Sequence, residues 1–252
     1  VTMSQDLYET DELLRQYLIF HYAGAMEQFP WDCGGADGLD FPRRCVSEGV
    51  DPAIIPDGAR ALDLGCAVGR SSFELARMCP EVIGVDFSRA FIDAANQLKK
   101  EGRQTVLRQD EGERSTPLEV RAPPGIDRER VVFEQGDVQA LRGDLGQFDV
   151  VLACNLVCRL PQPARFLGHL HELVKPGGQL FVTTPFSWLE AWTPRENWLG
   201  GTDKDSFTAM REALEPEFAL LCSWDMPFLI REHARKFQYT VAQASRWLRA
   251  DS

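Results

Sequence analysis

Long hydrophobic runs are missing from this sequence. No stretch approaches about 18 consecutive apolar residues, and the amino-terminal segment VTMSQDLYETDELL is acidic without an apolar signal region. The first absence argues against a membrane-spanning helix, and the second argues against a secretory signal. We therefore expect a cytoplasmic protein that does not use a membrane as a partner.

Positive charge is scarce relative to negative charge. The chain has 27 Lys and Arg residues against 38 Asp and Glu residues, a net charge of -11 at pH 7, and it has no basic block. Nucleic-acid affinity comes largely from Lys and Arg side chains that neutralise phosphates. The composition therefore argues against a nucleic-acid partner and favours a small-molecule substrate.

Residue types that bind metals are few or dispersed. The chain has four histidines and seven cysteines, with no C-x-x-C pair and no histidine at zinc-ligand spacing from a cysteine. We expect no bound metal, and we expect reduced thiols that pack as small hydrophobic side chains. Only Cys66, inside a glycine-rich loop, has a position that points to a ligand.

What the sequence does contain is an alternation of apolar strands and amphipathic helices. With 252 residues, of which 44% are hydrophobic, it is long enough for one α/β domain over residues 1–252 with a mostly parallel sheet and helices on both faces. Three regions depart from the alternation: a helical cap over 1–59, an inserted hairpin over 104–130 and an irregular loop over 187–203. The predicted strands cover 59–65, 82–87, 131–137, 148–155, 177–186, 218–230 and 236–247, the last two as an antiparallel edge pair.

Helix starts are signalled by polar caps. Thr10 precedes a helix over 11–22, and Ser88 precedes a helix over 89–102. Another helix is predicted over 69–79, directly after the first strand. The first two strands and the helix between them therefore form a βαβ unit.

The first strand runs into the glycine-rich segment RALDLGCAVGRS. A triphosphate loop would need a Lys followed by Ser or Thr after its last glycine, and this segment has no such Lys. A dinucleotide loop would need G-x-G-x-x-G, whereas the spacing here is Gly65-x-Ala67-x-Gly69, with Asp63 two residues earlier. A carboxylate at that point is a poor neighbour for pyrophosphate but a suitable one for a cationic ligand.

S-adenosylmethionine is a cationic ligand with these requirements, because it carries a sulfonium and an ammonium. Asp86, at the end of the second strand, is positioned for its ribose diol. Asp137, after the third strand, is positioned for the adenine amino group, with the Val138 backbone N–H beside it. Asn155 ends the fourth strand and faces the expected place of the methyl group.

The strand-end signatures LDLGCAVG, GVDFS, EQGD and FDVVLACN, followed by LVKPGGQL, resemble those of class I S-adenosylmethionine-dependent methyltransferases over residues 60–183. The resemblance implies a Rossmann-like sheet of seven strands, S-adenosylmethionine as cofactor and S-adenosylhomocysteine as its product. The implied cofactor-binding residues are Asp63, Gly65, Cys66, Ala67, Gly69, Arg70, Asp86, Phe87, Ser88, Asp137, Val138 and Asn155.

Segments outside the sheet carry a narrower resemblance. The segments YETDELLRQYLIFHYAG, FPRRCV, FSWLEAWTPRENWLGG and DMPFLIREHARKFQYTVAQAS are similar to the 4-mercaptohistidine N1-methyltransferase family of ovothiol biosynthesis, which includes the carboxy-terminal domain of the ovothiol synthase OvoA. The acceptor of that family is 5-thiohistidine, and methylation of a ring nitrogen yields ovothiol A. The resemblance also implies functional pairing with an iron-dependent sulfoxide synthase, either separate or fused.

A zwitterionic amino acid as acceptor sets its own demands. Its carboxylate needs a cation, for which Arg159 and Arg231 are the candidates, and its ammonium needs acceptors, for which Asn155 and Glu232 are the candidates. His21 could act as a general acid or base that selects the reactive ring tautomer. The aromatic candidates for walls around the ring and the cationic donor are Tyr8, Tyr22, Trp188 and Trp198.

The reaction itself needs alignment more than a strong base. A ring nitrogen with a lone pair must approach the methyl carbon in line with the departing sulfur, at roughly 3 to 3.5 Å.

Two alternatives to the thiohistidine methyltransferase hypothesis stay open. The acceptor could be another small amine, thiol or carboxylate, because a class I core fixes the donor and not the acceptor. The chain could also bind the nucleoside without catalysis.

Overall fold

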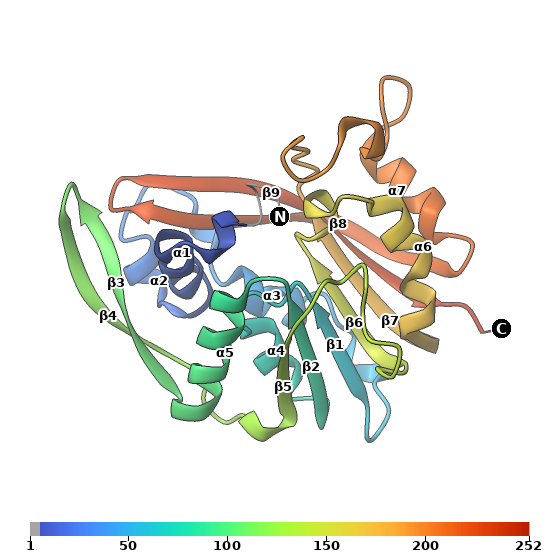
Figure 1. The fold of residues 1–252 in the computed structure, drawn as a ribbon, viewed down its shortest axis with the longest axis horizontal. Coiled ribbons are helices and arrows are strands. Elements are labelled where there is room, and N and C mark those ends of the chain that lie inside the picture. Colours follow the sequence, from blue (N-terminus) through green and yellow to red (C-terminus); the bar gives the residue numbers. More distant parts are fainter. Residues whose placement is uncertain (1–5, 252) are drawn as a thin grey trace.

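The computed structural model describes residues 6–251 and places seven strands in one sheet, in the order β5-β2-β1-β6-β7-β9-β8 (Figure 1). Strands β5, β2, β1, β6 and β7 are parallel, whereas β9 runs antiparallel to both β7 and β8. The predicted seven-stranded, mostly parallel α/β sheet with an antiparallel edge pair is therefore confirmed. The strand bounds are β1 Arg60–Leu64, β2 Glu81–Asp86, β5 Val131–Gln135, β6 Phe148–Cys154, β7 Val174–Thr184, β8 Phe218–His233 and β9 Lys236–Arg249.

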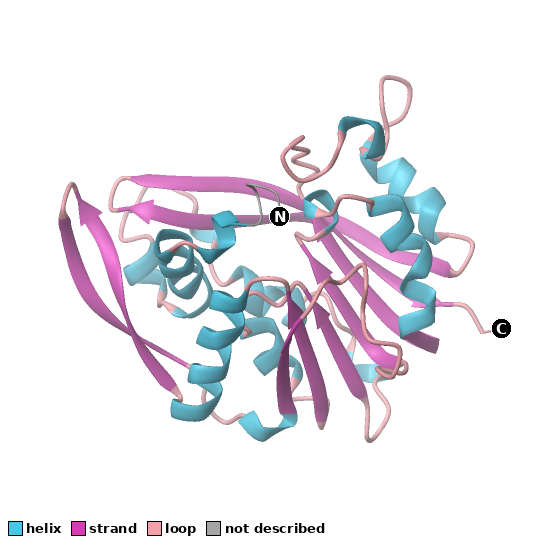
Figure 2. Cartoon of the chain, viewed as in Figure 1, coloured by secondary structure: helices cyan, strands magenta, loops and turns pink. Residues whose placement is uncertain are grey.

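Helices cover both faces of the sheet (Figure 2). Side chains alternate across β1, so that Ala61 packs on the side of the first group of helices and Leu62 packs on the side of the second group. The first group is α1 Asp11–Tyr22, α3 Phe41–Ser47, α4 Arg70–Leu75 and α5 Arg89–Glu101; the second is α6 Pro163–Leu173 and α7 Ser206–Leu214. The helix α2 (Ala25–Gln28) follows α1 in the amino-terminal cap.

The predicted helix caps are present. The Thr10 side chain accepts a hydrogen bond from Leu13 N at the start of α1, and the Ser88 side chain accepts one from Phe91 N at the start of α5. The helix predicted over 69–79 is shorter than expected, because α4 ends at Leu75. Pro80 disfavours helical geometry at Cys79 and leaves residues 76–78 as a turn.

Two long hairpins enclose the helical cap. The predicted insertion is the hairpin of β3 (Arg103–Glu111) and β4 (Arg114–Arg121), which forms its own two-stranded sheet. The β8–β9 hairpin extends beyond the main sheet above α1 and α2, and its tip approaches the insertion (Figure 1). Ala234 N, in the β8–β9 turn, donates to Asp110 O of β3 at 3.0 Å.

The parallel register brings the predicted strand ends together. In β1, Leu64 pairs with Val85 of β2 and with Ala153 of β6, so these three strands end at one edge. The loop after β1, Asp86 after β2 and Asn155 after β6 therefore meet there, as expected for a doubly wound sheet. Within the described part of the chain, no helix has both the length and the apolarity to cross a membrane.

Candidate functional site

A cavity of about 830 Å³ lies at the carboxyl ends of β1, β2 and β6. Its first half is lined by the strand-end segments, including Asp63, Asp86 and Asp137. Its second half, here called the acceptor chamber, is lined by Tyr8, by one face of α1, by Arg159, by the loop 185–194 and by β8 and β9. The cavity is thus continuous from the glycine loop to a region covered by the amino-terminal cap.

The glycine loop is held in a fixed shape by backbone hydrogen bonds. Gly65 N and Cys66 N donate to Val85 O at 2.8 and 3.1 Å, and Ala67 N donates to Asp86 Oδ2 at 2.9 Å. Three loop residues have left-handed φ angles, Gly65 at 73°, Ala67 at 48° and Gly69 at 86°. Tyr22 Oη donates to Val68 O at 2.6 Å and supports the loop from behind.

Two glycines of this loop disfavour a side chain, Gly69 because it would clash and Gly65 because it would make a tight contact. A Cβ at Gly65 would lie 3.1 Å from Leu156 Cδ1, and a Cβ at Gly69 would lie 2.4 Å from Phe133 Cζ. Gly65 lines the cavity, so its bare backbone is open to a ligand there. Gly69 does not line it; its φ and the contact with Phe133 make it a turn residue that starts α4.

Asp63 is a buried carboxyl on the floor of the cavity, and it is 2% exposed. Ser72 Oγ donates to its Oδ2 at 2.6 Å. Burial raises the pKa of Asp63 to about 7, against the lowering effect of the Ser72 hydrogen bond. A carboxyl in this state gains its charge most easily beside a cation, which fits the cationic ligand predicted from the sequence.

Asp86 is placed to bind a diol while it also fixes the loop. Its two oxygens accept from Ala67 N and Ser88 N, both at 2.9 Å. Burial raises the pKa of Asp86 to about 6. Phe87 and Ser88 line the same part of the cavity, and Phe87 is 48% exposed, so its ring can cover a bound nucleoside.

Asp137, Val138 and Asn155 also line the cavity, as predicted from their places after β5 and β6. Asn155 has a left-handed φ of 52°, and its Oδ1 accepts from Thr183 Oγ1 at 3.1 Å. This hydrogen bond leaves the Asn155 side-chain NH₂ as the group that can donate to a ligand. Three of the four predicted strand ends therefore supply a carboxylate, and the fourth supplies an amide.

The structure corrects the role expected for Arg70. It does not line the cavity; its Nε pairs with Glu74 Oε1 at 2.9 Å, and its Nη1 donates to His21 O at 3.1 Å. Arg70 therefore ties the end of α1 to the start of α4 and acts on the site through its charge and through His21.

His21 lines the cavity from the last turn of α1 and is 8% exposed. Burial first, and the Arg70 charge second, lower the pKa of His21 to about 3. A histidine in this environment is neutral at physiological pH and binds a proton poorly. The role of general base predicted from the sequence does not fit these surroundings.

In the acceptor chamber, Tyr8 joins the amino-terminal segment to the loop after β7. Its ring centroid lies 5.0 Å from that of Trp192 and 5.7 Å from that of Phe91. Tyr8 belongs to the short 3-10 helix η1 (Asp6–Glu9), which is held on α5 because Arg89 N donates to Glu9 Oε1 at 2.9 Å. The two segments thus cover the cavity together.

Arg159 is the one Lys or Arg among the described residues that line this cavity. It ends the 3-10 helix η5 (Val157–Arg159), and its Nη1 donates to Ser187 O at 2.9 Å. Its guanidinium also lies beside the Tyr8 hydroxyl. Of the two arginines predicted to hold an acceptor carboxylate, Arg159 alone is in place to do so.

The structure corrects the roles expected for Arg231 and Glu232. Arg231 is 3% exposed and pairs with Asp110 Oδ1 at 3.5 Å, while its Nη1 donates to Gln28 O at 3.3 Å. Glu232 pairs with Lys236 and accepts from Gln238 Nε2 at 2.9 Å. Arg231 therefore joins the β8–β9 hairpin to β3 and to α2, whereas Glu232 makes contacts within the hairpin. Neither side chain lines the cavity.

Three of the predicted aromatic walls also lie elsewhere. Tyr22 supports the glycine loop from outside the cavity. Trp188 and Trp198 stack on each other at 6.4 Å, and their indole nitrogens donate to Ser206 Oγ at 3.0 Å and Thr193 O at 2.8 Å. They stabilise the base of the 187–203 loop, whereas Trp192 of the same loop lines the cavity.

Several cavity residues were not predicted. On α1, the residues Leu13, Gln16, Tyr17 and Phe20 line the cavity on the same helical face as the predicted His21. Their spacing of three and four was visible in the sequence and fits a cavity wall as well as a core stripe. No pattern in the sequence marks Gln238 and Thr240 of β9 as cavity residues, because the position of the β8–β9 hairpin depends on tertiary packing.

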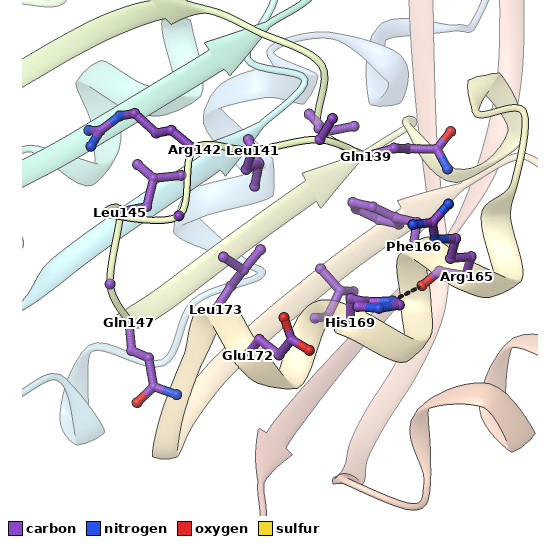
Figure 3. Close-up of a pocket in the computed structure, with 15 residues that line it drawn as sticks. Gln139, Leu141, Arg142, Leu145, Gln147, Arg165, Phe166, His169, Glu172 and Leu173 are labelled. Carbon is purple, nitrogen blue, oxygen red and sulfur yellow. Dashed lines mark hydrogen bonds between the residues drawn. The ribbon is translucent and has the colours of Figure 1, made fainter.

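A second cavity of about 440 Å³ lies between the loop 138–147 and α6 (Figure 3). There His169 Nδ1 lies 2.7 Å from Arg165 O, and Arg142 pairs with Glu134 at 3.0 Å and Asp144 at 2.7 Å. None of the glycine-loop residues lines it, so the strand-end chemistry belongs to the larger cavity. Among residues 6–251, no group of three or more His, Cys, Asp or Glu side chains is arranged to hold a metal ion.

In sequence, the chain is similar to methyltransferases. Residues 62–180 match the family described as "Methyltransferase domain". A ubiquinone biosynthesis O-methyltransferase of Coxiella burnetii is 28% identical over 135 residues, which cover 54% of this chain and 47% of that protein. The chain thus spans about half the length of the curated relatives it matches.

In fold, the chain is similar to many solved structures, of which two follow. One is the cyclase SpnF, with a TM-score of 0.56 and 18% identity, covering 97% of this chain and 96% of that one. The other is the magnesium protoporphyrin IX methyltransferase of Synechocystis PCC 6803 with bound S-adenosylmethionine, with a TM-score of 0.53 and 16% identity, covering 96% of this chain and 98% of that one. At these identities, the likeness establishes a shared fold.

Proposed function

We infer that this chain is a class I S-adenosylmethionine-dependent methyltransferase, which uses S-adenosylmethionine as methyl donor for a small amino-acid acceptor; its fold and the match of residues 62–180 to a methyltransferase domain support this inference. We propose that the acceptor is 5-thiohistidine, methylated on a ring nitrogen to give ovothiol A. The observation that carries the proposal is the acceptor chamber, which joins the donor half of the cavity and has Arg159 as the one arginine among its described lining residues.

The residues of the donor half fit S-adenosylmethionine. The carboxylate of Asp63 can attract its positive charge, and the carboxylate of Asp86 can accept hydrogen bonds from its ribose hydroxyls. The backbone of Gly65, which has no side chain, leaves space for its methionine tail. When bound, the cofactor supplies an electrophilic methyl group. The chain's own residues then have to orient the acceptor nitrogen and exclude water.

The acceptor chamber supports a small, zwitterionic, aromatic acceptor. Arg159 supplies the positive charge for a carboxylate. Glu190, a largely exposed side chain that also pairs with Arg195 at 3.9 Å, is the acidic side chain of the loop 185–194 that can face an ammonium. Tyr8, Tyr17 and Trp192 supply aromatic surface for an imidazole ring. Burial raises the pKa of Tyr8 and Tyr17, so both phenols stay protonated and can donate hydrogen bonds.

The proposed mechanism depends on the alignment of the acceptor nitrogen with the methyl group of the donor. The tyrosines and Trp192 would hold the ring, Arg159 would fix its amino-acid end, and the Asn155 amide would face the reacting groups. A bond forms between the ring nitrogen and the methyl carbon while the carbon–sulfur bond breaks, and the ring loses one proton to solvent. Because His21 is a poor base, the reaction relies on the lone pair of the acceptor's own ring.

The proposal is tested by incubating the purified protein with S-adenosylmethionine and 5-thiohistidine. We expect a product heavier by one methyl group, and much slower reaction with histidine, which lacks the sulfur. Arg159→Gln should raise the acceptor KM by about 10- to 100-fold through loss of a charge-assisted hydrogen bond, with the Kd for S-adenosylmethionine unchanged. Equal turnover of histidine and 5-thiohistidine would argue against a thiohistidine-specific enzyme.

A second candidate is O-methylation of a small phenol or carboxylic acid. It is favoured by the names of the curated relatives, which are ubiquinone biosynthesis O-methyltransferases and a trans-aconitate 2-methyltransferase from Deinococcus radiodurans. A panel of amines, thiols, phenols and carboxylic acids ranked by kcat/KM separates the two candidates. The highest value for a phenol or a carboxylic acid, with no turnover of 5-thiohistidine, would establish the second candidate.

A further inference from the structure

His21 has one ring nitrogen that is buried without a hydrogen-bond partner in the described chain, the Nδ1 atom. The ring is held on two sides, stacked at 5.9 Å on Tyr17 and edge-on at 5.3 Å against Phe20. These contacts fix the ring plane, so Nδ1 cannot rotate toward solvent. A buried polar atom without a partner in an otherwise well-packed helix end points to a functional constraint.

The unpartnered Nδ1 decides where the single proton of the neutral ring sits. A buried N–H without an acceptor costs more than a buried lone pair without a donor, so the favoured tautomer carries its proton on Nε2. His21 lines the cavity, and Nε2 is absent from the buried, unpartnered atoms. The ring therefore presents an N–H donor to the cavity.

The place of His21 relative to the glycine loop indicates which ligand atom receives this N–H. His21 O accepts from Arg70 Nη1 at 3.1 Å, directly after the loop, and the neighbouring Tyr22 Oη bonds to Val68 O within the loop at 2.6 Å. In the donor half, the charged side chains among the described lining residues are Asp63, Asp86 and Asp137, which are all acidic. Arg159 is tied to Ser187 beyond the end of β6. A carboxylate at the glycine loop thus has His21 as its nearby donor.

We propose that His21 is a cofactor-binding residue, which donates from Nε2–H as a neutral imidazole to the carboxylate of the methionine tail of S-adenosylmethionine. The proposal rests on the cofactor assignment in the proposed function and is independent of the acceptor. Neutral histidine gives directional binding without adding a positive charge beside the sulfonium. It also fits a histidine whose protonation is disfavoured by burial and, second, by the charge of Arg70.

Truncated ligands test this contact directly. The probe pair is S-adenosylhomocysteine, which has the amino-acid tail, and 5′-methylthioadenosine, which lacks it. The matched variants are His21→Gln, whose amide nitrogen lies near the position of Nε2, and His21→Asn, whose amide lies near Nδ1. Calorimetry should show that His21→Asn weakens the affinity for S-adenosylhomocysteine by about 10-fold or more and leaves the affinity for 5′-methylthioadenosine unchanged. His21→Gln should retain most of the affinity for S-adenosylhomocysteine.

Two results would overturn the proposal. Equal losses for both ligands would mean that the substitution disturbs the loop and not a carboxylate contact. An unchanged affinity for S-adenosylhomocysteine, with a raised acceptor KM, would place His21 on the acceptor instead. Neither result depends on whether 5-thiohistidine is the acceptor, so failure of the proposed acceptor is distinguishable from failure of this contact.

A second measurement uses the unmodified protein and no turnover. The ¹⁵N chemical shifts of the His21 ring identify its tautomer and its protonation state. We expect the Nε2–H tautomer and no titration of this ring above about pH 4, since its pKa is about 3. An Nδ1–H tautomer, or a ring that titrates near the ordinary histidine pKa of about 6.5, would contradict the proposal.

Discussion

Ser72 Oγ donates a 2.6 Å hydrogen bond to Asp63 Oδ2, and Asp63 still keeps a raised pKa of about 7 because it is buried. The hydrogen bond fixes the orientation of the carboxyl without making it strongly acidic. The donor half of the cavity therefore contains a group that changes charge near neutral pH. This property makes the binding of a cation sensitive to pH.

Donor binding should release a proton from Asp63. A carboxyl with a raised pKa is largely protonated below about pH 7, and a bound cation stabilises its charged form. The affinity for S-adenosylmethionine should therefore rise as pH increases through about 7. Calorimetry in buffers of different ionisation enthalpy measures the number of protons released on binding. In Asp63→Asn, the remaining pH dependence of the donor affinity should come from Asp86, near pH 6. Proton uptake on binding would contradict this assignment.

Asp86→Ala should weaken donor binding by about 1 to 3 kcal/mol and also loosen the glycine loop, because Asp86 accepts from Ala67 N at 2.9 Å. Equilibrium binding and urea unfolding measure the two effects. The matched control is Asp93→Ala on the outer face of α5, where the side chain is 69% exposed. The control should leave both quantities unchanged, and an Asp86→Ala protein with wild-type donor affinity would disprove the diol role.

Trp192→Ala should raise the acceptor KM by about 3- to 10-fold, because it removes an aromatic contact worth about 0.5 to 1.5 kcal/mol. Its ring lies 5.0 Å from Tyr8, so the change also opens the cover between the amino-terminal segment and the loop after β7. Trp31→Phe, at the far end of the β8–β9 hairpin, is the control, because Trp31 bonds to Ala234 O and does not line the cavity. Steady-state kinetics should separate the two variants.

Arg231→Met should lower the free energy of unfolding by about 2 to 4 kcal/mol, because it leaves Asp110 and nearby carbonyl groups without their buried partner. The acceptor KM of the folded variant should stay close to that of the wild type. Urea unfolding and kinetics measure the two quantities. A large rise in acceptor KM at unchanged stability would restore the substrate-binding role expected from the sequence.

The donor half could be predicted from the sequence because parallel register decides where strand ends go. Asp63 and Asp86 lie on neighbouring strands, β1 and β2, and Asn155 follows β6 on the other side of β1, so any parallel pairing brings them to one edge. No knowledge of distant contacts was needed.

The acceptor half was predicted only in part, because it is built by contacts between distant segments. Arg231 and Arg159 look alike in the sequence, yet β8 directs Arg231 into the junction with the β3–β4 hairpin. In the 187–203 loop, no periodicity tells which tryptophan faces the cavity, and the structure places Trp192 there. The pKa of His21 depends on burial and on Arg70, which the sequence of α1 alone does not contain.

The central claim is that this chain transfers a methyl group from S-adenosylmethionine to a ring nitrogen of 5-thiohistidine. The most direct test supplies the donor with a ¹³C-labelled methyl group and analyses the product by NMR. We predict a labelled methyl carbon that couples to the imidazole ring through nitrogen, and a coproduct of S-adenosylhomocysteine. A labelled methyl group on sulfur, or no label in the product while a phenol or carboxylic acid is methylated, would contradict the account.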